Sequence, residues 1–343
     1  MNQPVRIPYA ELCAQLAGRL QAAGLSADMA QEEAAIMAEA DLLGVPSHGV
    51  RMLPGLLAAL RDGRAKAQPA IRTEKRFAAV SLLDADNGPG RSLAAQAMRE
   101  AVSNARDAGI GACMALRTTH WGRAHAYASR AAQAGMIGIC TTNAMPTMAA
   151  WGATGRVIGN NPLAIAIPRA RHDQPLVLDI AMSQAAVGKV GTWLREGNTV
   201  PEGWGLDQDG NPSRDAAAIL AGAVLPFGGH KGAGLALMME LLTAALANTP
   251  FGHEIHAGDR SGLDPESAKL FIALNPDAFG GTAALHARVD DCLAYLSREA
   301  STREPFQWPG QRGWATREAN LRDGVPLHPE IVAQLAAVGV VPG

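Results

Sequence analysis

Short apolar runs alternate with helix-like segments through the middle of the chain, and this alternation limits the possible folds more than any other feature. The apolar runs occupy residues 78–83, 111–116, 136–140, 163–167 and 176–180, and Gly-rich turns separate them. Between the first three runs, residues 93–108 and 124–134 have the apolar spacing of helices. Strands that alternate with helices are typical of α/β proteins. We therefore expect an α/β fold for this part of the chain.

Both ends of the chain have a mostly helical character. Leu12, Leu16 and Leu20 repeat every four residues within a predicted helix over 9–23, and further helices are predicted over 27–43 and 50–61. The polar stretch 195–214 predicts an exposed excursion, and residues 232–248 predict an apolar helix. We expect a helical region over 1–68 that packs with the tail 285–343, and α/β regions over 69–130 and 160–284.

The composition excludes several classes of partner. Thirty Lys and Arg residues nearly balance 32 Asp and Glu residues, and the formal net charge of −2 offers no attraction to nucleic acid or to an anionic membrane. Only 18% of the residues are charged, below the roughly 25% of typical soluble domains, which indicates surface hidden against another subunit. Neither a secretory signal nor a membrane-spanning stretch is visible. We expect a cytoplasmic oligomer.

The common sequence signatures of nucleotide and metal sites are absent. No G-x-G-x-x-G follows a predicted strand, and no G-x-x-x-x-G-K-[ST] phosphate loop occurs. Any nucleotide must therefore be held in another way. The four cysteines have no C-x-x-C spacing, and the histidines form no H-E-x-x-H motif. We expect no metal site.

Polar residues are concentrated at the breaks between the predicted elements. Ser47 and His48 lie between two predicted helices, where the hydroxyl could cap the second helix or orient the imidazole. His120 follows the apolar run 111–116, and open α/β sheets bind ligands at such strand ends. Imidazole exchanges a proton near neutral pH, although a lone histidine is often only structural. The residues alone leave both interpretations open.

Three further segments could hold a small molecule. Asn160 lies in a Gly-Asn-Asn-Pro segment, which forms a turn or clamps a ligand. Asp179 closes the apolar run 176–180, and the small residues after it would let a flat ring approach the main chain. Lys231 lies in the Gly-dense segment 228–234 at the start of a predicted helix. Amide groups and an ammonium there could bind a pyrophosphate, or the glycines could simply permit tight packing.

In their order along the chain, these segments resemble one family, the NAD(P)-dependent malate/L-lactate dehydrogenases that are unrelated to the Rossmann dehydrogenases. Its members include ureidoglycolate and sulfolactate dehydrogenases, diketogulonate reductase, and piperideine- and pyrroline-2-carboxylate reductases. The matching segments are 47–49, 120–122, 159–162, 179–181, 188–189, 231–232 and 309–310. The resemblance implies a non-Rossmann NAD(P)-binding domain with a largely antiparallel or mixed sheet, and a second α/β domain for the substrate. It also implies a homodimer whose partner helps to complete the site.

The resemblance also implies roles for individual residues. His48 or His120 would exchange a proton with the substrate oxygen, and Ser47 would orient His48. Lys189 would be a further catalytic residue, and Arg51, Asn160 and Gly188 would bind the substrate. NAD or NADP would contact the following residues: Asp179, Ile180, Ala181, His230, Lys231, Pro309, Gly310 and Gln311.

Three positions differ from the family pattern. The family usually has an arginine four residues after the histidine of the Ser-His-Gly motif, where it holds the substrate carboxylate. Here that position is Met52, and Arg51 precedes it by one residue. Ala144 and Gln311 stand where the family more often has Ser and Glu, at positions that contact the cofactor.

The resemblance implies the interconversion of a small 2-oxo acid and its 2-hydroxy acid. Two alternatives are a cyclic-imine carboxylate reductase of the same fold and a non-catalytic nucleotide-binding protein. The cyclic-imine reductases carry an acidic residue at the position of Lys189, whereas the hydroxy-acid enzymes more often have Lys. An ammonium suits a carbonyl or a carboxylate better than a cationic imine. Lys189 therefore favours the 2-oxo acid.

Overall fold

A computed structural model describes residues 3–258, 266–300 and 305–340. The chain forms two compact units. The first comprises Met1–Cys140, Ala164–Asp179 and Phe271–Gly343, and the second comprises Thr141–Leu163 and Ile180–Leu270. No helix in the described ranges is both long and apolar enough to cross a membrane.

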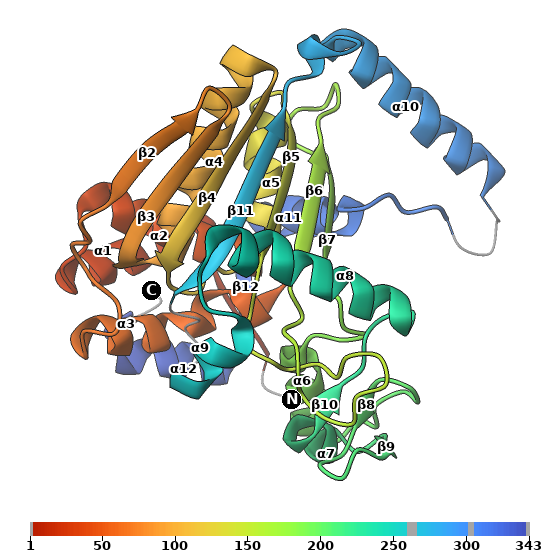
Figure 1. The fold of residues 1–343 in the computed structure, drawn as a ribbon. Coiled ribbons are helices and arrows are strands. Elements are labelled where there is room, and N and C mark those ends of the chain that lie inside the picture. Colours follow the sequence, from red (N-terminus) through yellow and green to blue (C-terminus); the bar gives the residue numbers. More distant parts are fainter. Residues whose placement is uncertain (1–2, 259–265, 301–304, 341–343) are drawn as a thin grey trace. The chain divides into compact units, whose positions relative to one another are not determined.

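A seven-stranded mixed sheet forms the centre of the first unit (Figure 1). In spatial order its strands are β2 (Arg72–Phe77), β3 (Val80–Gly88), β4 (Ile110–Thr118), β11 (Ser267–Leu274), β5 (Ile137–Thr142), β6 (Leu163–Ile167) and β7 (Leu176–Ile180). β2 and β3 are antiparallel, whereas β3 and β4 are parallel. The predicted α/β class and the predicted mixed sheet are therefore confirmed.

Helices rich in alanine pack against this sheet. α4 (Gly90–Ala108) connects β3 to β4, as a parallel pair requires, and α5 (His125–Gln133) lies beside it (Figure 1). Ala94, Ala97 and Ala101 of α4 are fully buried, and such small side chains let the helix approach the strands closely. Their core also contains the aromatic rings of Tyr127 and Phe271. This packing fixes the ends of β3 and β4, where the candidate site begins.

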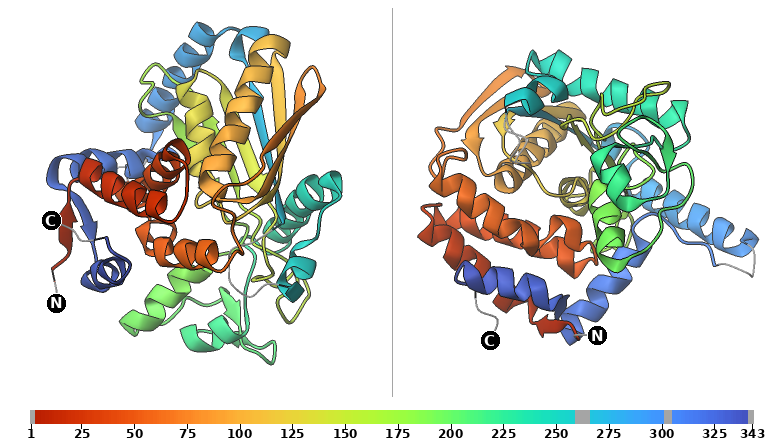
Figure 2. Two further views of the ribbon diagram at one scale, coloured as in Figure 1. Left: turned by 90° about the vertical axis from the view of Figure 1, so that its left-hand side faces the viewer. Right: turned by 90° about the horizontal axis from the view of Figure 1, so that it is seen from below.

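The two ends of the chain lie together. β1 (Val5–Ile7) pairs with β12 (Val325–Leu327), and α12 (Pro329–Ala337) lies beside the N-terminal helices in Figure 2. Those helices are α1 (Tyr9–Ala22), α2 (Ala27–Leu42) and α3 (Leu53–Arg61), close to the predicted ranges. Their buried leucines share one core with Val325 and Leu335. The helical N-terminal region therefore packs with the last part of the chain.

The remaining elements of the first unit include two that the sequence did not predict. They are the 3-10 turns η1 (Pro46–His48), η2 (Val50–Met52) and η4 (Pro276–Ala278), and the helices α10 (Thr282–Glu299) and α11 (Gln311–Asp323). α10 and α11 were not predicted. α11 is held by tertiary contacts, because Trp314 donates to Pro175 O and Asn320 donates to Leu42 O.

The second unit is built from short elements around a smaller core. They are α6 (Val187–Glu196), β8 (Gly205–Leu206), β9 (Pro212–Ser213), α7 (Ala216–Ala221), β10 (Ala223–Val224), α8 (His230–Glu240), the π-helical segment η3 (Leu241–Ala245) and α9 (Gly252–Gly258). The predicted excursion over 195–214 is exposed at most of its positions, but not at all of them. Val200 and Leu206 are buried, and β8 pairs with β9 and β10 in a small sheet.

Candidate functional site

A buried carboxylate holds the turn that carries Ser47 and His48. Asp41, on the last turn of α2, accepts the Val50 N–H at 2.7 Å. Gly49 is required there, because a Cβ would lie 1.9 Å from Asp41 Oδ2. The Ser47 hydroxyl is hydrogen-bonded to His48 Nδ1 at 2.8 Å. Since Nδ1 is engaged, His48 presents Nε2 to a ligand.

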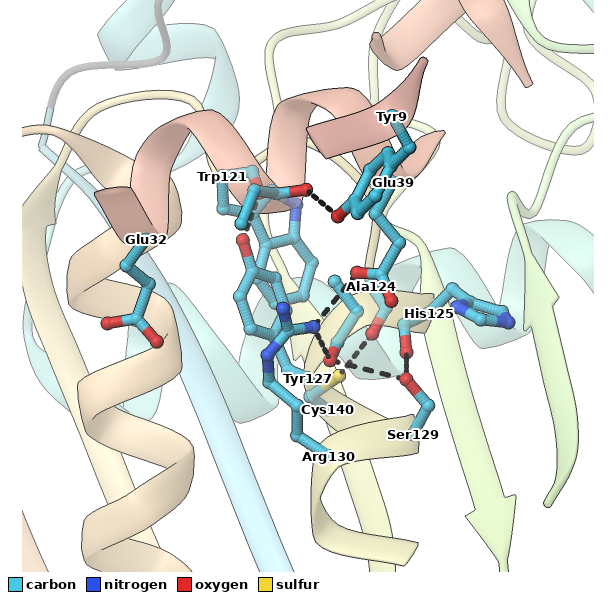
Figure 3. A network of polar contacts seen from close by, with 12 residues as sticks. Tyr9, Glu32, Glu39, Trp121, Ala124, His125, Tyr127, Ser129, Arg130 and Cys140 are labelled. Atoms are coloured by element: carbon cyan, nitrogen blue, oxygen red, sulfur yellow. Dashed lines mark hydrogen bonds and ion pairs between the residues drawn. The ribbon is translucent and has the colours of Figure 1, made fainter. Parts of the chain in front are cut away.

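His120 lies in the turn that follows β4. Its Nδ1 accepts the Gly122 N–H at 3.1 Å, so a neutral His120 ring carries its proton on Nε2 as a donor. Figure 3 shows how the residues after it are held: the Tyr127 hydroxyl donates to Trp121 O, and the Cys140 thiol donates to Ala124 O. These bonds fix the turn against α5 and β5.

The first unit brings the two histidines together. Their ring centroids are 6.0 Å apart and their planes differ by 27°. Burial lowers the pKa of His48 from 6.5 to about 4. The charge of Asp179 acts against this shift, whereas the charges of three arginines reinforce it. His48 is therefore neutral at pH 7 in the free protein.

Those three arginines differ in burial and in their partners. Arg123 donates to Asp179 at 2.9 Å, and this ion pair is largely buried. Arg91 is buried with Glu33, at 3.0 Å. Arg51 is exposed on η2. Spacing rules could not have found Arg91 and Arg123, because their contacts join distant segments. Each of the two is paired with a carboxylate, so their charges are partly balanced.

Two of the segments predicted to bind a cofactor lie side by side in the first unit. Val177, two residues before Asp179, donates its N–H to Pro309 O at 2.9 Å. Gly310 has φ +97°, and a Cβ there would lie 3.2 Å from Val177 N. Gln311 accepts the Trp308 N–H at 3.1 Å. These contacts hold the turn 309–311 beside β7, whose last two residues are Asp179 and Ile180.

The second unit places Lys189 on an aromatic surface. Its ammonium lies 4.9 Å from the ring centroid of Trp193 and 5.3 Å from that of Trp204. The two rings are stacked 5.1 Å apart. Gly188 precedes Lys189 in the first turn of α6, and its carbonyl accepts the Thr192 hydroxyl. The indoles orient the ammonium by cation–π attraction while it stays exposed to solvent.

A buried polar network fixes the segment that contains Asn160. The Asn161 amide donates to Glu240 Oε2 at 2.7 Å and accepts the Ala144 N–H at 2.9 Å. Asn160 itself is half-buried, and its carbonyl accepts the Met182 N–H at 2.8 Å. Glu240 is the single charge of the predicted apolar helix, and this network explains why it is buried.

The start of α8 is tightly packed rather than open. Lys231, Gly232 and Ala233 all donate their N–H groups to backbone carbonyls. A Cβ on Gly232 would lie 2.5 Å from Phe227 O, so packing alone requires this glycine. His230 contacts the Trp151 ring edge to face, and the Lys231 side chain is exposed. An anion here would be bound by side chains, because these amides are already engaged.

The predicted site residues thus fall into two groups. The first unit holds Ser47, His48, Arg51, His120, Asp179, Pro309, Gly310 and Gln311, and the second holds Asn160, Ile180, Ala181, Gly188, Lys189, His230 and Lys231. The half-buried Ile180 and Ala181 directly follow Asp179 in the chain. Sequence reasoning missed Asp41 and the Glu33–Arg91 pair. The sequence signal for them is that Glu33 and Asp41 fall on the buried side of the helix predicted over 27–43.

Comparisons with known proteins agree on one family. The family model for malate/L-lactate dehydrogenase matches residues 7–336. The chain is 35% identical to an L-sulfolactate dehydrogenase of Methanocaldococcus jannaschii over 321 residues, covering 92% of this chain and 91% of that protein. It is also 35% identical to a Delta(1)-pyrroline-2-carboxylate/Delta(1)-piperideine-2-carboxylate reductase of Pseudomonas putida, covering 94% of each. The solved structure of a sulfolactate dehydrogenase from M. jannaschii superposes with a TM-score of 0.90 at 30% identity, covering 97% and 96% of the two chains.

Proposed function

The chain belongs to the malate/L-lactate dehydrogenase family of NAD(P)-dependent oxidoreductases, and from this membership we propose that it interconverts a small 2-oxo acid and its 2-hydroxy acid. The observation that carries the proposal is the His48–His120 pair, 6.0 Å apart beside Asp179 and three arginines. Imidazoles exchange the proton of a hydroxyl, and arginine side chains bind carboxylates.

The chain's own residues supply proton exchange and orientation. Ser47 fixes the His48 ring through Nδ1, so Nε2 takes the proton from the hydroxyl of a 2-hydroxy acid. His120 donates from Nε2 to the same oxygen and polarises it, because its Nδ1 is already an acceptor. In the reverse direction the oxygen receives its proton from this pair. We also assign substrate contacts to Lys189, Asn160 and Gly188, which belong to the second unit.

The nicotinamide cofactor supplies or accepts the hydride. The residues fit a nucleotide, because a partly buried carboxylate, Asp179, lies on the strand beside the turn 309–311 and can accept from a ribose hydroxyl. We assign cofactor contacts to Ile180, Ala181, His230 and Lys231, and to Pro309, Gly310 and Gln311. No G-x-G-x-x-G motif occurs in the sequence, and we propose that the nucleotide is bound in a non-Rossmann manner. In this proposal the α/β regions 69–130 and 160–284 supply the residues that bind the nucleotide and the substrate.

A cofactor titration followed by a substrate panel tests this function. NADH and NADPH fluorescence should each be titrated with the protein, and the better cofactor combined with pyruvate, oxaloacetate, 3-sulfopyruvate and piperideine-2-carboxylate. We expect one cofactor to bind and a 2-oxo acid to be reduced fastest, because Lys189 would repel a cationic imine. Faster reduction of piperideine-2-carboxylate would establish the cyclic-imine alternative, and absence of any cofactor binding would refute the proposal.

We also propose that the enzyme is a homodimer. Six apolar side chains on the helical segment 235–246 are exposed: Leu235, Leu237, Met238, Leu241, Leu242 and Leu246. Such a row rarely faces water in a monomer, and obligate dimers bury roughly 2,000 Å² or more.

We also propose that the protein is located in the cytoplasm. The free thiols of all four cysteines support this location.

Light scattering at micromolar concentration should report about twice the chain mass of 35.7 kDa. Leu242→Glu should shift this mass toward the monomer, because it would bury a charge in the interface. Phe77→Glu is the matched control, since Phe77 is exposed on an edge strand elsewhere. A monomeric wild-type protein would contradict the proposal.

A further inference from the structure

We propose that Arg91 binds the substrate carboxylate through the Nε/Nη2 edge of its guanidinium, and that Met52 covers this edge in the free protein. The inference rests on the proposed 2-oxo acid reaction and names the residue that recognises the acid.

Arg91 lies next to the turn that carries His120. It is the second residue of α4, and the preceding Gly90 donates its N–H to Thr119 Oγ1 at 2.8 Å. A Cβ on Gly90 would lie 2.0 Å from Thr119 O, so the helix start packs against this turn without a gap. The charge of Arg91 also acts on His48. Arg91 therefore belongs to the surroundings of both histidines.

Two nitrogen atoms of the Arg91 guanidinium, Nε and Nη2, have no oxygen acceptor among the described residues. Glu33 accepts only from Nη1, at 3.0 Å, and its other oxygen accepts the Ser92 N–H at 2.9 Å. Across the described ranges, the buried Nε of Arg91 has no hydrogen-bond partner. Nη2 lies 3.2 Å from the Met52 sulfur, and a thioether is a weak acceptor. Unsatisfied donors in a buried guanidinium are costly, so this edge fits a ligand with two oxygens.

The same edge binds a carboxylate elsewhere in this protein. Arg117 donates from Nε to Asp84 Oδ1 at 2.8 Å and from Nη2 to Asp84 Oδ2 at 2.6 Å. Such paired bonds are the strongest that arginine forms with an acid. Arg91 presents the same two donors, and Glu33 leaves both of them available.

A glycine lies beside this edge. An ideal Cβ on Gly122 would lie 3.0 Å from Arg91 Nε, which is the distance of a hydrogen bond. Because Gly122 has no Cβ, no side chain from this position lies against Arg91 Nε. Met52 is half-buried, whereas Arg91 is only 2% exposed. Methionine has a flexible side chain, so an incoming carboxylate can displace the thioether from Nη2.

Arg51 is the candidate that the sequence indicated for this role. It is exposed on η2, where solvent weakens its attraction for an anion. We therefore expect Arg51→Ala to raise KM only about 2- to 5-fold. The paired donors of Arg91 provide the larger part of carboxylate binding.

Replacement of Arg91 tests the assignment. Arg91→Gln should raise the KM for the best 2-oxo acid about 100-fold, and Arg91→Lys about 10-fold, because lysine keeps the charge but loses the paired donors. The kcat should change less than KM, and the cofactor affinity in the fluorescence titration should stay the same. Arg99→Gln is the matched control, since it removes an exposed ion pair with Glu32 from the same helix, and its KM should match wild type.

A second variant keeps Arg91 intact and so does not depend on its contribution to folding. Met52→Glu supplies a carboxylate from the chain itself, which should bind the free edge and exclude the substrate. We expect KM to rise at least about 10-fold without a loss of Tm. Met52→Leu keeps the volume without the sulfur and should retain the wild-type KM.

A wild-type KM in Met52→Glu, or in folded Arg91→Gln and Arg91→Lys, would overturn the assignment of Arg91. Such results would leave the proposed function standing, because the wild-type enzyme would still bind its cofactor and reduce a 2-oxo acid. Failure of the wild-type enzyme in those two assays refutes the proposed function instead.

Discussion

His48→Gln and His120→Gln are expected to lower kcat, and the residue that exchanges the proton should lose about 10²- to 10⁴-fold. Glutamine keeps the polarity and approximate size of histidine but does not exchange a proton near neutral pH. Cofactor affinity should remain, because neither ring is assigned to the cofactor. Ser47→Ala should cost less than either change, since it removes only the bond to His48 Nδ1. Stopped-flow measurement of single turnovers would separate the chemical step from product release.

The pH profile of the same enzymes identifies which histidine is the base. Since the pKa of His48 is about 4 in the free protein, its imidazole is mostly neutral above about pH 5. If His48 is the base for oxidation of the 2-hydroxy acid, kcat/KM should fall only as the pH drops below about 5. A histidine of ordinary pKa would produce that fall near pH 6.5. Near wild-type turnover in both glutamine variants would refute the assigned mechanism.

Asp41→Asn is expected to raise the free energy of unfolding at pH 8 by about 2–4 kcal/mol and to change it little near pH 4. Burial raises the pKa of Asp41 from 3.8 to about 7, so the folded state binds its proton more tightly than the unfolded state. This stabilisation is complete below the unfolded pKa of about 4, and it is lost as the pH rises through about 7. Asparagine remains neutral and can still accept the Val50 N–H.

Chemical denaturation of the wild-type and variant proteins between pH 4 and 8 measures this difference. Asp209→Asn is the matched control, because Asp209 is exposed and its exchange should leave the pH dependence unchanged. Parallel curves for the wild-type protein and Asp41→Asn would show that Asp41 is ionised in the folded state at low pH as well.

The elements that could be predicted from the sequence are those whose pattern is local. The strands over 163–167 and 176–180 occur as predicted, because each is a continuous apolar run. β2 was missed, because its sequence, Arg-Thr-Glu-Lys-Arg-Phe, is that of a charged edge strand with every residue exposed. α11 was missed, because the distant partners of Trp314 and Asn320 hold it in place. Where stability comes from remote contacts, a local pattern carries little information.

The same distinction applies to the site. The histidines could be singled out because each interrupts a regular pattern. Their approach to 6.0 Å depends on the packing of α2, α4 and β4, which no spacing rule contains. The contact between Arg91 and Met52 is of the same kind. The sequence showed that Met52 departs from the family pattern, but only the structure shows which side chain lies against it.

The order of strands in the sheet also determines when the protein can fold. β11 lies between β4 and β5, yet it begins only at Ser267, after nearly all of the second unit. During synthesis on the ribosome, β4 and β5 therefore lack their shared neighbour β11, which is made more than a hundred residues later. Until then each exposes an unpaired edge, which is a site for aggregation. We therefore expect the chain to be most prone to aggregation between the synthesis of β5 and that of β11.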